Sequence, residues 1–365
     1  MDDYTWRKKL QERQRRVKRE RFFFLLFLVA SLGALLWYFG VYARTPEYAA
    51  KQIEQALEEK DLPTFQQYTA LDLLLSDAYD DLTVDLFHND NTLSPQTKAL
   101  FEKFYVLVKP QLTHATAEAV YHRISTGGWI MPEGTDMLKG RQLGIDFEEF
   151  LERSLLRHTV IQRFGEIARA DDAVTLRLHV MEERTRTPFT LELGMEKNED
   201  RVWQVTSIRN YRSYLETVSP RIYQDIAQYI ADTADIVARY NESLQAHQWT
   251  VQYLSYSSGG RLGKGQRTEL SSYLEDRVIP EIKKRQEELD QVEARPGAEY
   301  LAELRSESTD LSIRVWQHYI HALREDNIAE YNTAESLHKQ MLAVEQRIED
   351  IVRHAAVANT VPDMP

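Results

Sequence analysis

The sequence contains no cysteine among its 365 residues. This absence excludes disulfide bonds, thiol catalysis and anchoring through a lipid-modified cysteine, so stability must come from core burial. The serines lack the Gly-x-Ser-x-Gly surroundings of a hydrolase nucleophile. The glycine-rich stretch Gly259–Gly265 is not a phosphate-binding loop, because it follows a predicted helix and has Gly265 where that loop needs a hydroxyl residue. We interpret the stretch as a flexible turn, and predict no catalytic residue, no cofactor and no enzyme activity.

Charge is absent from residues 22–43, FFFLLFLVASLGALLWYFGVYA. As a helix this run would extend about 33 Å, enough to cross a hydrocarbon core of about 30 Å. We predict a single-pass transmembrane signal-anchor helix over 22–43. Its anchoring residues would be Phe22, Phe23, Phe24, Leu25, Leu26, Leu35, Leu36, Trp37 and Tyr38. The alternative is a cleaved signal peptide with Val41-Tyr42-Ala43 as its cleavage site, although the run exceeds the usual apolar region of about 7–15 residues.

The residues before this run, 1–21, form a basic tail with nine Lys and Arg against four acids. Basic residues beside a membrane span are retained in the cytoplasm, so residues 44–365 are expected outside the cell membrane. The topology signal comprises Arg13, Arg15, Arg16, Lys18, Arg19 and Arg21. Residues 22–365 carry a net charge of −17, which disfavours nucleic acid as a partner.

A first outer domain is expected over 45–215, with helices followed by strands. Helical spacing of apolar residues begins at Pro46, and a short helix is predicted at 146–157. The pattern then alternates with a period of two in four segments: 159–169, 173–183, 188–196 and 202–211. Such alternation predicts an antiparallel sheet with one buried face.

The helical start TPEYAAKQIEQALEEKDLPTFQQYTALDLL and the closing strand in EDRVWQVTSIRNY resemble the NTF2-like superfamily, in particular its uncharacterised, single-pass membrane-anchored bacterial members. The resemblance implies helices packed in the concavity of a curved antiparallel sheet. NTF2-like enzymes place an Asp or His inside that cone. His158, His179 and Asp146 are available here, but they do not match such a set residue by residue. The cone could also hold a small molecule.

A second outer domain is expected over 217–358, where glycine and proline are few. Four amphipathic segments joined by short breaks predict an antiparallel helical bundle with coiled-coil-like packing. Pro280 is expected to kink the second helix. Residues 359–365 would be a disordered tail. The aromatic residues that could form an interaction surface are Trp249, Tyr253, Tyr256 and Trp316.

Two groups in the bundle have metal-ligand spacing. Glu335 and His338 have the Glu-x-x-His spacing of di-iron bundles, but that chemistry needs a second such motif and two further carboxylates. His318 and His321 lie one helical turn apart, with Glu325 four residues further on. We interpret both groups as solvated helix faces and predict no metal site.

Together these features predict an N-terminal transmembrane helix, an α+β NTF2-like domain and an all-α antiparallel helical bundle. We expect a non-enzymatic, membrane-anchored protein of the bacterial cell envelope that binds another protein or the cell wall. The first alternative is an NTF2-like domain that binds a small molecule in a sensor or carrier role. The second is an enzyme that uses an Asp/His pair in the pocket.

Overall fold

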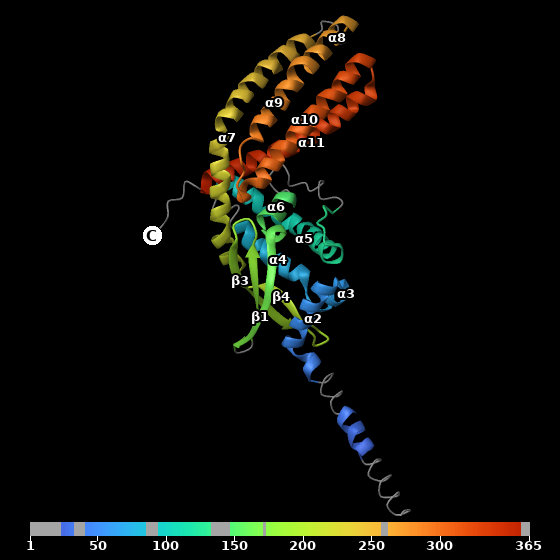
Figure 1. The fold of residues 1–365 in the computed structure, drawn as a ribbon, viewed down its shortest axis with the longest axis vertical. Helices are drawn as coiled ribbons and strands as arrows, with labels where there is room; N and C mark the ends of the chain where they lie inside the picture. Colours follow the sequence, from blue (N-terminus) through green and yellow to red (C-terminus); the bar gives the residue numbers. More distant parts are fainter. Residues whose placement is uncertain are drawn as a thin grey trace, which may run out of the picture.

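The computed structural model describes residues 23–32, 41–84, 94–132, 147–170, 173–256 and 262–358 (Figure 1). These ranges are mostly helical, with a four-stranded antiparallel sheet and a helical C-terminal region. The elements after residue 41 are η1 (Tyr42–Arg44), α2 (Pro46–Glu59), α3 (Leu62–Tyr68), α4 (Leu71–Thr83), α5 (Pro95–Thr126), α6 (Phe147–Arg153), η5 (Leu156–His158), β1 (Thr159–Ala170), β2 (Ala173–Glu182), β3 (Thr187–Lys197), β4 (Trp203–Ile208), α7 (Tyr211–Ser255), α8 (Lys264–Tyr273), η6 (Leu274–Val278), α9 (Ile279–Leu289), η7 (Pro296–Ala298), α10 (Glu299–Glu325) and α11 (Ile328–Ala358).

The predicted fold class is wrong in its N-terminal transmembrane helix. Within the ranges given above, no helix is long and apolar enough to cross a membrane. The described helical stretch, 23–32, contains the predicted anchor residues Phe23, Phe24, Leu25 and Leu26. The other predicted anchor residues and all predicted topology residues lie outside the described ranges: Phe22, Leu35, Leu36, Trp37, Tyr38, Arg13, Arg15, Arg16, Lys18, Arg19 and Arg21. The predicted tail, 359–365, lies outside them as well.

The sheet is a meander in which each strand pairs with its neighbour in sequence, in the order β1-β2-β3-β4. The four strands overlap the four segments predicted from the alternation, but β4 ends at Ile208 and the last predicted residue, Tyr211, begins α7 instead. On β2, buried Val174, Leu176, Leu178 and Val180 alternate with less buried residues, because successive side chains of a strand point to opposite faces. The buried face packs against the N-terminal helices and the start of α7, and Thr69, after α3, forms a bridge to β4.

Helix α7 is the longest element, with 45 residues, and it connects the sheet to the helical region (Figure 1). It begins at Tyr211, so it passes through the boundary expected between 215 and 217 without a break. Its first turns bury Tyr214 and Leu215 against the sheet, and apolar residues further along pack in the helical region. One apolar core therefore extends across both predicted domains.

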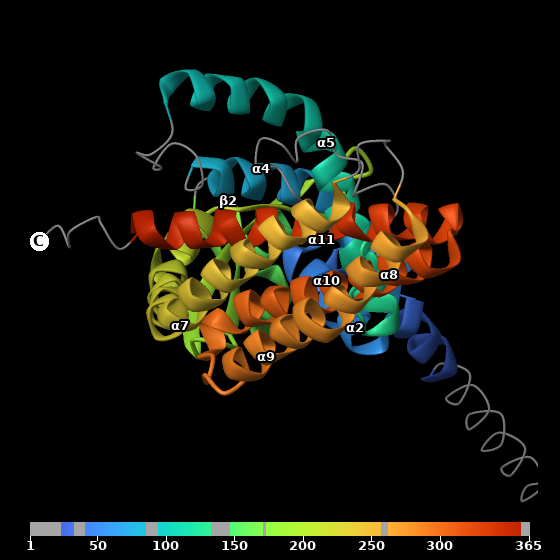
Figure 2. The ribbon, with the colours of Figure 1, turned by 90° about the horizontal axis from the view of Figure 1, so that it is seen from above.

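The helical region contains the four amphipathic segments that the sequence indicates, with one local difference. The kink expected at Pro280 is preceded by a π-helical turn, η6, so that Pro280 lies in the first turn of α9. The backbone remains helical from α8 through η6 into α9, and the π-helical turn is the local irregularity that accompanies the proline. Seen from above, α7, α9, α10 and α11 lie beside one another (Figure 2).

Candidate binding groove

A long groove lies between α7 and α11, and α9 and α10 complete its lining. It consists of two adjoining cavities of about 510 Å³ and about 1220 Å³. All four helices contribute to the residues that line both cavities: Leu244, Gln248, Arg285, Ser312 and Met341. On α7 the lining extends from Ile230 to Gln252, which corresponds to about 33 Å of helix. The groove is therefore elongated, with Arg285 where its two halves meet.

The lining is mainly apolar in the half nearer the end of α7, whereas apolar and polar residues line the half nearer the sheet in about equal number. The half nearer the end of α7 is lined by Val251, Ile282, Val315, Trp316 and Tyr319 among others. The half nearer the sheet has aliphatic residues on both sides, including Ile230 on α7 and Ile348 on α11. An elongated apolar groove between helices suits the apolar face of an amphipathic helix.

A polar layer extends from the junction of the two cavities, at Arg285, into the half of the groove nearer the sheet. Arg305 on α10 is 7% exposed, donates a 2.7 Å hydrogen bond to the Thr233 hydroxyl on α7, and lies over the Tyr229 ring at 5.0 Å. Arg285 lines the groove beside it, and burial lowers the pKa of its guanidinium below the ordinary value. Glu345 on α11 accepts a hydrogen bond from Ser308. This layer places two guanidinium groups and one carboxylate among apolar side chains.

Exposed aromatic residues lie beside the groove at the end of α7. Trp249, Tyr253 and Tyr256 are 68%, 80% and 75% exposed. Trp249 and Tyr253, four residues apart, lie on one face of α7, and Tyr256 is the residue that caps the end of the helix. Trp249 lies one helical turn beyond Gln245, which lines the groove, so this face adjoins the groove. Across the groove, α11 exposes Ile328, Tyr331 and Leu342.

These positions bear on the aromatic residues singled out from the sequence. Trp249, Tyr253 and Tyr256 are solvent-exposed, whereas Trp316 is half-buried and lines the groove. The structure therefore brings the four residues to one end of the helical region. Sequence reasoning missed Arg285 and Arg305, because a charged residue in a helix normally indicates a solvated face. Each is an Arg at an otherwise apolar position of its helix. Such a residue can be recognised as part of a groove only once the neighbouring helices are known.

The side walls of the groove are acidic. Its lining includes Glu242 on α7 and Glu335, Glu345 and Glu349 on α11. The lining arginines, Arg285 and Arg305, come instead from α9 and α10. Carboxylates thus lie along both walls, and the positive groups lie between them.

The metal-ligand candidates do not converge. Glu335 forms an ion pair with Lys339, and His338 lines the groove. His318 is bonded to Glu330 at 2.6 Å. Throughout the described part of the chain, no group of three or more His, Asp or Glu residues is placed to hold a metal ion. Of the glycine stretch Gly259–Gly265, residues 259–261 lie outside the described ranges, and 264–265 begin α8.

The residues considered for the NTF2-like cone are also apart. His158 bonds to Glu152 at the start of the sheet, whereas His179 bonds to Thr190 across β2 and β3 at 2.9 Å. Asp146 lies outside the described ranges. The inward side chains of the sheet are buried in the apolar core, for example Leu176 and Leu193.

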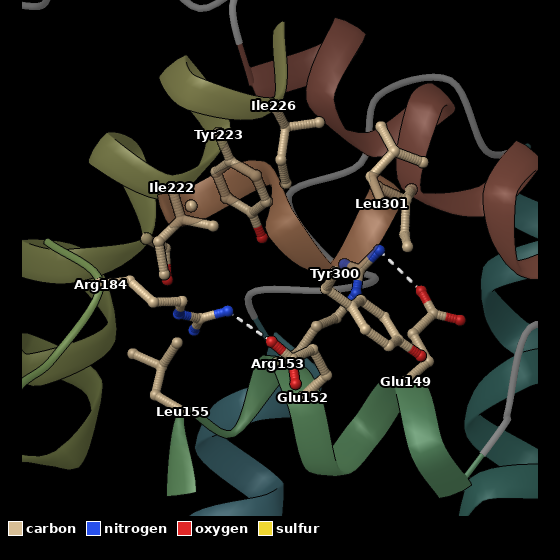
Figure 3. A pocket seen from close by; sticks show the side chains of 13 residues that line it. Glu149, Glu152, Arg153, Leu155, Arg184, Ile222, Tyr223, Ile226, Tyr300 and Leu301 are labelled. Carbon is tan, nitrogen blue, oxygen red and sulfur yellow. Dashed lines mark hydrogen bonds and ion pairs between the residues drawn. The ribbon is translucent and has the colours of Figure 1, made fainter. Parts of the chain in front are cut away.

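A second cluster of charges is buried where α6 meets the helical region (Figure 3). Arg184, with a 7% exposed side chain, pairs with Glu182 and Glu152, and Arg153 pairs with Glu149 at 2.7 Å. All of these residues except Glu182 line a cavity of about 50 Å³. Burial disfavours the charged form of Glu152, but hydrogen bonding to His158 and the charge of Arg184 outweigh it and lower the pKa of the carboxyl. Because acids and bases are paired, we interpret this cluster as structural.

Comparison of the chain with family models, with curated proteins and with solved structures gave no match. The resemblance to the NTF2-like superfamily therefore stays a prediction. So do the location in the cell envelope and the exclusion of nucleic acid as a partner.

Proposed function

We propose that this chain is a protein-binding module whose groove, between α7 and α11, holds an amphipathic α-helix of a partner protein. The observation that carries the proposal is the elongated groove itself, which has apolar residues along its whole length. Its lining on α7, from Ile230 to Gln252, matches about six turns of helix. A compact small molecule would leave most of this length empty. A helix laid along it would bury its apolar face from end to end.

The groove margins support a protein partner. Trp249, Tyr253 and Tyr256 on one side and Tyr331 on the other are exposed beside the apolar lining. Aromatic residues are enriched at protein interfaces, where they contribute most of the binding energy when they become buried. A patch of this kind on a soluble surface indicates an interaction site.

Charge indicates which helices would bind. The walls present Glu242, Glu335 and Glu349 to the two flanks of an occupant. A helix with Lys or Arg on both flanks of its apolar stripe complements these carboxylates, and a helix with acidic flanks is repelled. The partner is therefore expected to be a basic amphipathic helix.

The test uses a synthetic 22-residue helix with a Leu/Ala stripe and Lys flanks, labelled with fluorescein and titrated with the full chain. Ala234→Trp places a bulky side chain in the groove, and is expected to weaken binding at least tenfold. Ala246→Trp adds the same bulk to an exposed site of α7 outside the groove lining, and should leave the affinity unchanged. Equal affinities for the two variants would contradict the proposal.

A charge reversal provides the second arm. Glu242→Lys with Glu349→Lys should weaken binding and reduce its dependence on salt, because screened attraction to the walls is lost. Glu58→Lys with Glu199→Lys, exposed and outside the groove, is the matched control. If Ala234→Trp instead converts a dimer to a monomer in sedimentation, the groove's occupant is a second copy of the chain and the proposal is wrong.

No observation in the described residues favours the alternative of a small molecule inside the sheet. The inward side chains there form a buried apolar core, and the three largest described cavities lie in the helical region.

A further inference from the structure

We infer that the helix held in the groove carries a carboxylate on its apolar face, at the level where it crosses Arg285 and Arg305. The inference rests on the proposed function and adds a requirement to it. An amphipathic helix normally has no charge on its buried face. The expected partner would therefore be recognisable by one Asp or Glu in the middle of its apolar stripe.

Arg285 is the first reason. It lines both halves of the groove. Its Nε is buried and has no hydrogen-bond partner, and no ion pair joins this residue to any other in the described part of the chain. Arginine presents five N–H donors in a planar fork that matches a carboxylate. Its donors are thus available to an occupant of the groove.

Arg305 is the second reason. Only a neutral group, the Thr233 hydroxyl, accepts its hydrogen bond at 2.7 Å, and its positive charge lies over the Tyr229 ring. The single carboxylate of the polar layer, Glu345, is already bonded to Ser308. The charge of Glu345 also acts on Arg285 and favours its charged form, so that of the two guanidinium groups in the layer only one is balanced by a carboxylate of the layer.

Filling the groove would remove water from this layer. A guanidinium that loses water without gaining an acceptor is strongly disfavoured, because a buried charge needs a partner. A wholly apolar helix would impose that cost at Arg285, whereas a carboxylate at the same place would form a charge-assisted pair. Since Arg285 lies where the two cavities meet, the carboxylate belongs near the middle of the occupant.

The test compares two versions of the synthetic helix, with Glu or Gln at the central position of the stripe. The full chain is expected to bind the Glu peptide about tenfold more tightly. This preference runs against the acidic walls, which would favour the less negative Gln peptide. Arg285→Met should reduce the preference to less than twofold and bind the Gln peptide at least as tightly as the unaltered chain does, because the unpaired charge is removed.

Lys283→Met is the matched control, since it removes a positive charge from the same helix at a position outside the groove lining. It should leave the tenfold preference intact. Equal binding of both peptides by the unaltered chain, with both weakened by Ala234→Trp, would overturn the carboxylate inference and leave the groove proposal standing. If Ala234→Trp leaves the affinity for both peptides unchanged, the groove proposal itself is wrong.

Discussion

At the scale of single residues, Glu182 at the end of β2 is a fully buried carboxylate with three hydrogen bonds. Arg184 Nε donates to it at 2.8 Å, and the backbone N–H and the hydroxyl of Thr185 each donate at 2.7 Å. Burial raises the pKa of Glu182, but these donors outweigh it and hold the pKa below its ordinary value of 4.5. A lowered folded-state pKa stabilises the fold above the unfolded-state pKa, and this stabilisation is lost as the pH falls through the folded-state value.

Glu182→Gln is therefore expected to lower the free energy of unfolding by about 1–3 kcal/mol at pH 7, because Arg184 keeps Glu152 but loses one of its two carboxylate partners, and an amide cannot accept all three hydrogen bonds. The difference from the unaltered chain should shrink as the pH falls below 4.5. Chemical denaturation at several pH values measures it. Glu183→Gln, at the exposed neighbouring position, should have little effect. A Glu182→Gln difference that stays constant from pH 7 to pH 3 would contradict this account.

At the scale of elements, the turn η7 packs closely against α7. A Cβ on Gly297 would lie 2.9 Å from the Asp225 Cβ and 3.0 Å from the Ile222 Cα. The backbone of Gly297 also donates to Asp225 at 3.2 Å. Close approach of η7 to α7 therefore requires glycine at this position.

Gly297→Ala is expected to destabilise the chain by about 1–3 kcal/mol, the usual cost of overpacking a tight contact. Gly265→Ala is the matched substitution, since its Cβ would meet nothing within 4 Å at the start of α8. Alanine is the better helix former, so Gly265→Ala should be neutral or stabilising by up to about 1 kcal/mol. Thermal unfolding of both variants measures the difference. An equal loss of stability in Gly297→Ala and Gly265→Ala would contradict the packing argument.

The elements also show how far the sequence was informative. Alternation such as that from Val174 to Val180 predicted the strands, because the period of a half-buried strand is present in one short segment. The continuity of α7 across residue 217 was missed, since a domain boundary depends on packing between distant segments. The same holds for the groove. Sequence periodicity identified α7 and α11 as amphipathic, but it could not show that part of their apolar surface lacks a partner.

At the scale of the whole molecule, the core is divided differently from the predicted domains. One apolar cluster joins the sheet to the sheet-proximal part of the helical region, and includes Leu176 and Leu215 together with Leu301 and Ile351. A second cluster lies among α8, η6, α9 and α10, around Leu274. The far end of the helical region is therefore expected to open independently of the rest.

Leu274→Ala should cost about 2–5 kcal/mol locally, because it leaves a cavity in the second cluster. Hydrogen exchange should accelerate in α8, η6 and the adjoining end of α10, while the sheet keeps its protection. Leu342→Ala, at an exposed leucine of α11, should change neither the stability nor the hydrogen-exchange rates. Faster exchange throughout the sheet in Leu274→Ala would show that the two clusters unfold as one unit.

The binding groove is the central claim, and photocrosslinking in cells that produce the chain tests it most directly. A benzophenone amino acid at Gln248, an exposed position shared by both cavities, reports what occupies the groove. We predict that mass spectrometry will identify an amphipathic helical segment of another protein, with basic flanks and a central carboxylate in its apolar stripe, and that Ala234→Trp will abolish the crosslink. A crosslinked segment without an apolar helical stripe, or one that persists in Ala234→Trp, would contradict the claim.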